Sequence, residues 1–271
     1  MSLNEFSIAG STAIVTGASR GIGRGIAVAF AEAGVDLCLA ARNEAALATV
    51  AGEVRKMGRR CLAVRCDVTK AADVEAMARQ AVSELGKVDI LVNNAGMMTV
   101  KPVVPLPGFN PPGADKLGNF FAPTSDAEWA DVMDTNLKSA FLCMRVVVPH
   151  MIGRKQGRVI NISSVAAIKA GRYRVSYDVS KAGLSRLTAS AAVEWARYGI
   201  TVNAIGAGYV HTEMIAEAMA DERLRQRTLA EIPLRRPATE REVALLAVYM
   251  ASPAGAYLTG QTVWLDGGMT A

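Results

Sequence analysis

Tyr177 and Lys181 are four residues apart in a segment with helical periodicity, so both side chains should lie on one face of a helix. The ordinary pKa of a tyrosine is about 10, which is too high for a base at neutral pH. A lysine ammonium on the same face favours the phenolate, and we therefore expect Lys181 to lower the pKa of Tyr177. Such a pair can move a proton to or from a carbonyl or alcohol oxygen, although the same spacing is common between ordinary helical neighbours.

Further polar residues stand where strands are expected to end. Ser163 and Ser164 follow the apolar run 159–162, Asn93-Asn94-Ala95-Gly96 follows another such run, and Asn136 lies on a long predicted helix between them. Because the carboxyl ends of parallel strands meet at one edge of a sheet, we expect these groups to gather there.

A glycine-rich turn follows the first predicted strand. Its glycines at 17, 21 and 23 are spaced Gly-x-x-x-Gly-x-Gly rather than Gly-x-Gly-x-x-Gly. A tight turn of this kind brings backbone N–H groups and a helix N-terminus onto a pyrophosphate. The turn therefore predicts a dinucleotide site, with an ordinary turn as the alternative.

The end of the second predicted strand, Ala41-Arg42-Asn43, indicates which dinucleotide would bind. The usual spacing would make Asp36 the ribose-binding acid, but Asp36 begins the strand and the ligand should lie beyond the other end. No carboxylate stands within those three residues, and Arg42 with Arg20 can clamp a 2′-phosphate. NADP(H) is therefore favoured over NAD(H), with two solvated arginines as the alternative.

Strands and helices alternate along the whole chain, which predicts a single-domain α/β fold for residues 1–271, with about seven parallel strands and helices on both faces of the sheet. The expected strands are Thr12–Thr16, Asp36–Ala41, Cys61–Cys66, Asp89–Val92, Gly157–Ile162, Thr201–Ile205 and Thr262–Leu265. The expected helices are Ile22–Ala33, Glu44–Met57, Ala72–Leu85, about Ala127–Ile152, about Ser176–Tyr198 and about Glu240–Met250.

The segment of about residues 97–125 interrupts this alternation. It is rich in proline, glycine and phenylalanine, and it is long for a connection in a compact domain. It follows the ligand-binding end of a strand, so it could cover a substrate pocket or could project for contact with another subunit.

Composition excludes several classes of protein. The 271 residues are 51% hydrophobic with a formal net charge of +5, which argues against disorder, and no clustered basic patch suggests nucleic-acid binding. No run of apolar residues is long enough to span a membrane, and the N-terminus lacks a secretory leader. The four cysteines have no metal-ligand spacing and indicate buried, reduced thiols in the cytosol, while His150 and His211 stand alone, so no metal site is expected.

Taken together, these motifs resemble the short-chain dehydrogenase/reductase family over nearly the whole chain, in particular its 3-oxoacyl-reductase-like and sugar-alcohol-dehydrogenase-like branch. The residues that carry the resemblance are Thr16–Gly23, Asp67, Asn93–Gly96, Asn136, Ser164, Tyr177, Lys181, Asn203 and Leu265-Asp266-Gly267-Gly268.

The resemblance implies a role for each site residue. Tyr177 would be the general acid/base, Lys181 would lower its pKa and bind the nicotinamide ribose, Ser164 would hold the substrate oxygen, and Asn136 would anchor a water. Asp67 and Val68 would contact the adenine, and Val210 and Thr212 the carboxamide. The full expected cofactor set is Gly17, Ser19, Arg20, Gly21, Ile22, Gly23, Arg42, Asn43, Asp67, Val68, Asn93, Ala95, Gly96, Tyr177, Lys181, Val210 and Thr212. Most such proteins are homotetramers.

The chain departs from the family pattern at two places. Ala207-Gly208 replaces the usual Pro-Gly, which should loosen the turn that carries Val210 and Thr212, and the segment at 97–125 is about twice the usual length.

The expected function is transfer of a hydride between NADP(H) and a ketone or secondary alcohol, such as a small carbonyl compound, sugar, polyol or cyclic substrate. Reduction of a 3-oxoacyl thioester is the alternative, with Arg172 and Arg174 available to an acidic carrier protein. A non-catalytic nucleotide-binding protein is a remote alternative, because Tyr177, Lys181 and Ser164 are all present.

Overall fold

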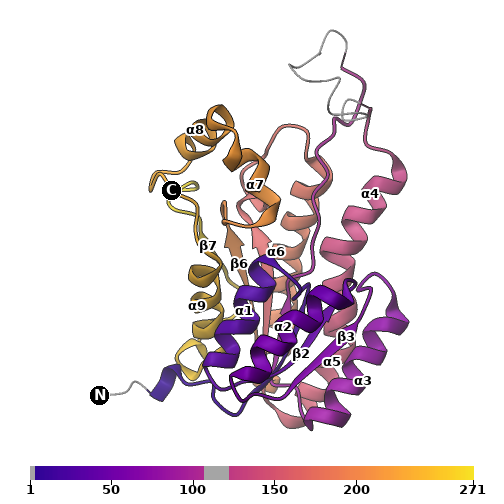
Figure 1. The fold of residues 1–271 in the computed structure, drawn as a ribbon. Coiled ribbons are helices and arrows are strands. Elements are labelled where there is room, and N and C mark those ends of the chain that lie inside the picture. The colour runs from indigo at the N-terminus through magenta and orange to yellow at the C-terminus, as the bar shows by residue number, and fades with distance from the viewer. Residues whose placement is uncertain (1–3, 107–121) are drawn as a thin grey trace.

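The described strands form one parallel sheet of seven strands (Figure 1). The structure is a computed structural model, and it describes residues 4–106 and 122–271. The strands are β1 (Thr12–Thr16), β2 (Asp36–Ala41), β3 (Cys61–Arg65), β4 (Ile90–Asn93), β5 (Gly157–Ser164), β6 (Ile200–Ala207) and β7 (Thr262–Leu265). Their order is β3-β2-β1-β4-β5-β6-β7, which confirms the predicted doubly wound sheet. The order reverses between β1 and β4, and ligands of such sheets bind at the carboxyl ends of the strands on either side of that point.

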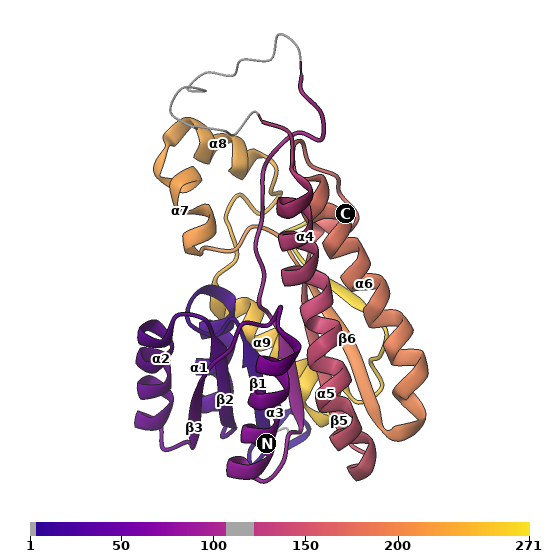
Figure 2. The same cartoon turned by 90° about the vertical axis from the view of Figure 1, so that its right-hand side faces the viewer.

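Helices cover both faces of the sheet (Figure 2). One face carries α1 (Gly21–Glu32), α2 (Glu44–Lys56) and α9 (Glu240–Ala251), and the other carries α3 (Ala71–Leu85), α5 (Ser139–Arg154) and α6 (Val175–Trp195). Successive residues of β1 enter opposite cores, with Val15 in the first and Ile14 in the second. A strand buried on both faces must be apolar throughout, which explains its continuous aliphatic run.

The long helix predicted at about 127–152 has a break in its hydrogen bonding. It consists of α4 (Asp126–Met133), a π-helical turn of five residues (Asp134–Lys138) and α5, and the Ser139 N–H donates to the Asp134 carbonyl five residues back. A π-turn often marks a functional site and has no compositional signature, so the helical periodicity predicted one uninterrupted helix.

Two helices were absent from the sequence prediction, α7 (Glu213–Ala220) and α8 (Glu222–Ala230). They lie beyond the carboxyl ends of the strands (Figure 1). No residue of α8 is buried, so this helix lacks the apolar period from which helices were predicted. Across the described ranges, no helix is both long and apolar enough to cross a membrane.

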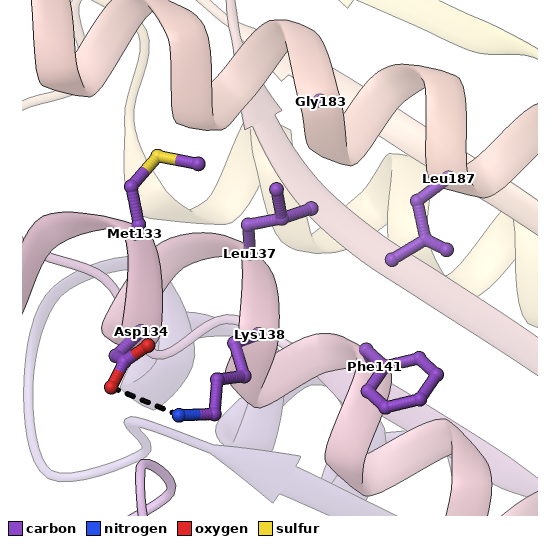
Figure 3. Close-up of a pocket in the computed structure, with 7 residues that line it drawn as sticks. All are labelled: Met133, Asp134, Leu137, Lys138, Phe141, Gly183 and Leu187. Carbon is purple, nitrogen blue, oxygen red and sulfur yellow. Dashed lines mark hydrogen bonds and ion pairs between the residues drawn. The ribbon is translucent and has the colours of Figure 1, made fainter. Parts of the chain in front are cut away.

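An apolar groove lies on the outer surface between α6 and the continuous helix formed by α4, the π-turn and α5 (Figure 3). Its lining residues are Met133, Asp134, Leu137, Lys138, Phe141, Gly183 and Leu187. None of the predicted site residues is among them. All four cysteines are free and buried, as expected.

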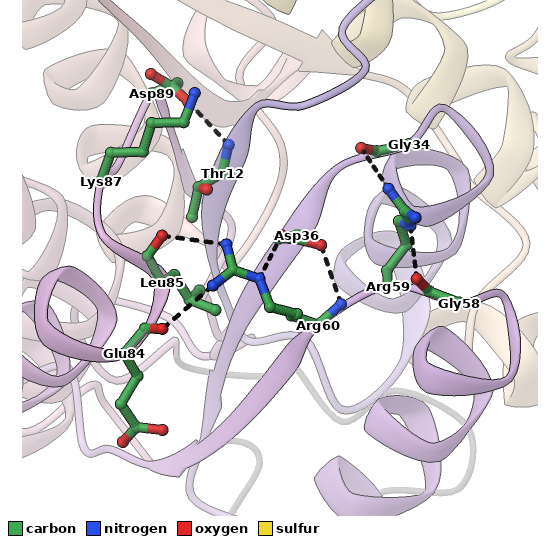
Figure 4. Close-up of polar contacts among 10 residues, drawn as sticks. All are labelled: Thr12, Gly34, Asp36, Gly58, Arg59, Arg60, Glu84, Leu85, Lys87 and Asp89. Atoms are coloured by element: carbon green, nitrogen blue, oxygen red, sulfur yellow. Dashed lines mark hydrogen bonds and ion pairs between the residues drawn. The ribbon is translucent and has the colours of Figure 1, made fainter.

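Asp36 is the first residue of β2 and so lies at the amino-terminal ends of the strands, opposite the ends where ligands of such sheets bind (Figure 4). Its carboxylate accepts hydrogen bonds from the Arg60 backbone N–H at 3.0 Å and from Arg60 Nε at 2.7 Å. Asp89 lies at the same edge, where it accepts from Thr12 N–H at 2.9 Å, pairs with Lys87 at 2.9 Å and binds Arg154.

The pairing of Asp89 should make stability depend on pH. Burial raises its pKa, but the hydrogen bonds from Arg154, Lys87 and the Thr12 N–H lower it more, so the pKa lies below its usual range. Asp89→Asn is expected to lower the free energy of unfolding at pH 7 by about 1–3 kcal/mol. Because the pKa is lower in the folded state, this stabilisation is complete above the unfolded-state pKa of about 4 and is lost as the pH falls through the folded-state pKa.

Urea unfolding of both proteins between pH 3 and pH 8 would measure this difference. We expect it to be constant near neutrality and to shrink in acid. Asp36→Asn is the matched control, because Arg60 is 58% exposed and such a pair contributes less than about 1 kcal/mol. Equal losses in the two variants would contradict the prediction.

Candidate active site

The glycine-rich turn connects β1 to the N-terminus of α1. Gly17 and Gly21 have φ angles of +64° and +57°, in the left-handed region that favours glycine. Arg20 is the N-cap residue of α1, its backbone is extended, and its side chain makes no capping hydrogen bond. The first N–H groups of α1 therefore have no side-chain cap, and a helix N-terminus of this kind can receive a phosphate.

Asn94 holds this turn against the end of β4. Its Nδ2 donates to the Thr16 carbonyl at 2.9 Å and to the Gly17 carbonyl at 3.1 Å. A Cβ at Gly17 would lie 2.9 Å from that nitrogen, and a Cβ at Gly23 only 2.4 Å from it. Backbone atoms are equally near, with Ala95 Cα 2.8 Å from the Cβ position at Gly17 and the Gly17 carbonyl oxygen 2.4 Å from that at Gly23, so neither position has room for a side chain. The sequence pattern predicts a ligand contact for these glycines and does not indicate this contact with Asn94.

Three further expected cofactor residues lie at the end of β4 and in the turn that follows it. Asn93 is buried and its Nδ2 donates to Asn161 Oδ1 at 2.8 Å, so its side chain connects β4 to β5. The Ala95 N–H donates to Thr16 Oγ1 at 3.2 Å. A Cβ at Gly96 would be 3.4 Å from Asn136 Oδ1 and 3.6 Å from Lys181 Nζ. The turn after β4 therefore lies directly beside two of the predicted catalytic residues.

Ser164 and Tyr177 come together between the end of β5 and the first turn of α6. Ser164 lies close enough to the Tyr177 hydroxyl to act on its pKa, which it lowers. Ser163 is turned away, because its hydroxyl donates to the Lys181 carbonyl at 3.2 Å and lies 2.9 Å from Ser185 Oγ. The side chains of the two adjacent serines therefore point in different directions, and Ser164 is the one that lies close to the Tyr177 phenol.

The pKa of Tyr177 is raised in this structure, whereas the sequence led us to expect Lys181 to lower it. Burial raises the pKa of Tyr177, while the Ser164 hydrogen bond and the Arg174 guanidinium act in the opposite direction without outweighing it. The Lys181 ammonium donates to the Ile162 carbonyl at 2.8 Å and lies 5.7 Å from the centre of the tyrosine ring. Burial also lowers the pKa of Lys181 to about 8. The phenol is therefore a proton donor in the unliganded chain.

Asn136 lies in the π-turn and is 2% exposed. Its Nδ2 donates to the Met97 carbonyl at 2.8 Å and to Ser180 Oγ at 3.0 Å, and its Oδ1 accepts from the Met97 N–H at 2.8 Å. Both amide protons are therefore used, and the side chain serves to connect three segments.

Of the two arginines expected to bind a 2′-phosphate, Arg20 is already paired with an acidic side chain, and Arg42 has no such ion pair among the described residues. Arg20 pairs with Glu213 at 2.5 Å, and both side chains are exposed. Arg42 is also exposed, and its charge helps to lower the pKa of Asp67, whose burial acts the other way. Asn43 Oδ1 accepts from the Ala46 N–H at 3.0 Å and so caps α2.

The remaining expected contacts surround the same edge. Ser19 and Ile22 in the turn are half-buried, and Val68 is buried beside Asp67.

Hydrogen bonds hold the turn after β6, although this turn has Ala207 where the family usually has proline. The Ala238 N–H donates to the Tyr209 carbonyl at 2.9 Å, and the His211 N–H donates to the Ala238 carbonyl at 2.8 Å, which fixes Val210 between them. Thr212 Cγ2 lies 3.5 Å from the Cβ position of Gly21.

The described ends of the 97–125 segment are bound close to the active site. The Lys101 N–H donates to the Tyr173 carbonyl at 2.6 Å, four residues before Tyr177, and the Thr124 N–H donates to the Pro102 carbonyl at 2.8 Å. Lys101 also pairs with Glu128 in the first turn of α4. Residues 107–121, on which the alternatives for this segment depend, lie outside the described residues.

Comparison with known proteins agrees with this arrangement. A family profile described as enoyl-(acyl carrier protein) reductase matches residues 17–270. The 3-oxoacyl-[acyl-carrier-protein] reductase FabG of Staphylococcus aureus is 38% identical over 260 residues, which cover 95% of this chain and 97% of that protein.

Two solved structures share the whole fold. A short-chain type dehydrogenase/reductase from Mycobacterium marinum has a TM-score of 0.87 at 34% identity, over 99% of both chains. The Pseudomonas aeruginosa RhlG/NADP active-site complex has a TM-score of 0.84 at 34% identity, over 100% of both chains. Matches of this extent and identity show that the chain is an oxidoreductase of the short-chain dehydrogenase/reductase family.

Proposed function

We propose that this protein transfers a hydride between NADP(H) and a ketone or secondary alcohol, with Tyr177 as the general acid/base. The observation that carries the proposal is the placement of Tyr177 and Ser164 close together, with the buried Lys181 5.7 Å from the tyrosine ring, at the carboxyl ends of the strands beside the glycine-rich turn. Candidate substrates are small carbonyl compounds, sugars, polyols and cyclic ketones or alcohols.

The residues of the chain would handle the substrate oxygen and its proton. When bound, NADP(H) supplies or takes up the hydride. In reduction, Ser164 would donate a hydrogen bond to the carbonyl oxygen, and Tyr177 would give that oxygen its proton as the alcohol forms. The raised pKa of Tyr177 suits this direction, because the phenol keeps its proton at neutral pH. In oxidation, Ser164 would hold the alcohol oxygen, and Tyr177 would have to be in its phenolate form to take the proton of the alcohol.

NADP(H) fits the donor groups at the other end of the site. The uncapped N-terminus of α1 offers N–H groups to a pyrophosphate, and Arg42 extends from the end of β2 with no carboxylate in Ala41-Arg42-Asn43. Arginine binds phosphate through paired hydrogen bonds, which favours a cofactor with a 2′-phosphate over NAD(H). The solved NADP complex of a relative is consistent with this preference.

Reduction of a 3-oxoacyl thioester is the second candidate, because relatives carry that name. The sequence suggested that two arginines, Arg172 and Arg174, could bind an acidic carrier protein, but only one of them is exposed. Arg174 Nη2 donates to the Lys169 carbonyl at 3.0 Å, and Arg174 Nε lies 2.9 Å from Asp178 Oδ1. Arg174 is thus bound to its own loop, and Arg172 is the exposed one of the two arginines suggested for an acidic carrier protein.

A substrate panel tests the proposal. NADPH oxidation should be measured with ketoses, cyclic ketones and acetoacetyl thioesters at matched concentrations. We expect turnover with a small ketone or ketose to exceed that with the thioesters. A thioester that is the best substrate would establish the second candidate instead. NADPH binding without turnover of any class would favour a non-catalytic nucleotide-binding protein.

We also infer a cytoplasmic homotetramer. Buried free thiols suit a reducing compartment. The groove of Figure 3 and the exposed Phe141 and Val193 give the outer surface of α5 and α6 an apolar character that contact with a second copy would cover. Light scattering should then give a mass four times the 28.6 kDa of one chain, and a monomer would contradict this inference.

A further inference from the structure

Ser180 lies between Tyr177 and Lys181 on α6, and its side chain is completely buried. Its hydroxyl donates to the Tyr177 carbonyl at 2.7 Å and accepts from Asn136 Nδ2 at 3.0 Å. One hydroxyl thus connects the backbone of the proposed proton donor to the side chain held in the π-turn.

The π-turn is itself fixed to the backbone beyond β4. Asn136 exchanges two hydrogen bonds of 2.8 Å with the N–H and carbonyl groups of Met97, the residue after Gly96. The bonds therefore run without interruption from the strand end through Asn136 and Ser180 to Tyr177. Buried polar groups that are fully bonded in this way hold their segments in one arrangement.

A second contact brings the π-turn close to the same face of α6. Gly183 is three residues after Ser180, and a Cβ there would lie 2.9 Å from Leu137 Cδ2. Residues three apart share a helix face, so two small residues let the π-turn approach α6 closely. The packing of Leu137 sets how near the two segments are, while the Ser180 hydroxyl adds directional bonds at the turn that carries Tyr177.

We propose that Ser180 is a positioning residue for Tyr177, a statement that rests on the proposed function. It holds the first turn of α6 in register with Asn136 and touches neither substrate nor cofactor. Without the hydroxyl, the Tyr177 carbonyl loses a donor and Asn136 Nδ2 loses an acceptor, so that turn can move. A displacement of about 1 Å at a catalytic group can cost on the order of 100-fold in rate.

The same helix offers a matched control. Thr188 is also completely buried, its Oγ1 donates to the Leu184 carbonyl at 2.8 Å, and it accepts from Asn161 Nδ2 at 2.8 Å. Thr188 and Ser180 therefore make the same pair of bonds, but Thr188 lies further along α6, away from Tyr177. Thr188→Val removes the hydroxyl and keeps the shape, so it reports the loss of stability alone.

Ser180→Ala should lower kcat by about 10–100-fold and leave the Kd for NADPH within about twofold, because the altered turn positions the reacting group. Thr188→Val should lower Tm to a similar degree and keep kcat within about twofold of the unaltered protein, measured well below either Tm. The rates use NADPH and the best substrate of the panel. Ser180→Cys retains the side-chain size with a weaker donor, and we expect an intermediate kcat.

A second measurement does not depend on turnover. Ultraviolet absorbance of the phenolate during a pH titration, taken as the difference between each variant and the same variant with Tyr177→Phe, isolates the pKa of Tyr177. We expect this pKa to shift in Ser180→Ala and to stay unchanged in Thr188→Val. Equal kcat in Ser180→Ala and Thr188→Val, or an unshifted pKa in Ser180→Ala, would overturn the proposal. If Ser180→Ala does not fold, the same two criteria apply to Ser180→Cys.

The design separates this proposal from the proposed function. Activity that survives Tyr177→Phe alone would refute the role of Tyr177 and with it the role of Ser180. An inactive Tyr177→Phe variant combined with a fully active Ser180→Ala variant would refute Ser180 only.

Discussion

Replacing Tyr177 with phenylalanine is expected to lower kcat by about 10²–10⁴-fold, the usual contribution of a general acid or base. The ring stays in place and only the hydroxyl is lost, so the Kd for NADPH should remain within about twofold. The phenol that is lost lies close to Ser164 and to the buried Lys181. Rates of NADPH oxidation and quenching of protein fluorescence by NADPH measure the two quantities separately.

Tyr198→Phe is the matched control for this change. Tyr198 lies after the C-terminal end of α6, where its hydroxyl accepts a hydrogen bond from Arg197 at 2.5 Å. This variant should keep full activity. A Tyr177→Phe protein that turns over substrate at the rate of the control would show that another group delivers the proton.

Replacing Arg42 with aspartate is expected to shift the ratio of kcat/KM for NADPH to kcat/KM for NADH by about 10²-fold toward NADH. The change removes charge-assisted hydrogen bonds to a 2′-phosphate, each of which contributes about 1.5–3 kcal/mol, and adds a carboxylate that can accept from a ribose hydroxyl. Arg42 is the better choice of the two arginines, because Arg20 already pairs with Glu213.

Arg59→Asp gives the same change in net charge at the opposite edge of the sheet, where Arg59 Nη1 donates to the Gly34 carbonyl (Figure 4). It therefore controls for long-range attraction of the anionic cofactor, which also falls with added salt. The ratio should be unchanged in this control. An Arg42→Asp protein with the original preference for NADPH would exclude Arg42 from the 2′-phosphate site.

Local sequence patterns were sufficient to predict the strands of the sheet and to nominate candidate site residues at the carboxyl ends of those strands. Continuous aliphatic runs predicted strands buried on both faces, and such strands with intervening helices admit few topologies. The motifs at Thr16–Gly23, Asn93–Gly96 and Tyr177–Lys181 each follow or begin a regular element, so the fold brings them to one edge. Where the signal was absent, prediction failed: α8 buries no residue, and the π-turn has the composition of an ordinary helix.

Residue types and their spacing along the chain sufficed to predict the fold class and the family, and they named Ser164, Tyr177 and Lys181 as the residues of the proposed site. The tertiary structure decided how those residues are held and charged. It showed that Asn94 and nearby backbone leave no room for side chains at positions 17 and 23, that Ser180 connects Asn136 to Tyr177, and that burial raises the pKa of Tyr177. These properties depend on distances and burial among residues remote in the chain, and residue type and spacing along one segment do not encode them.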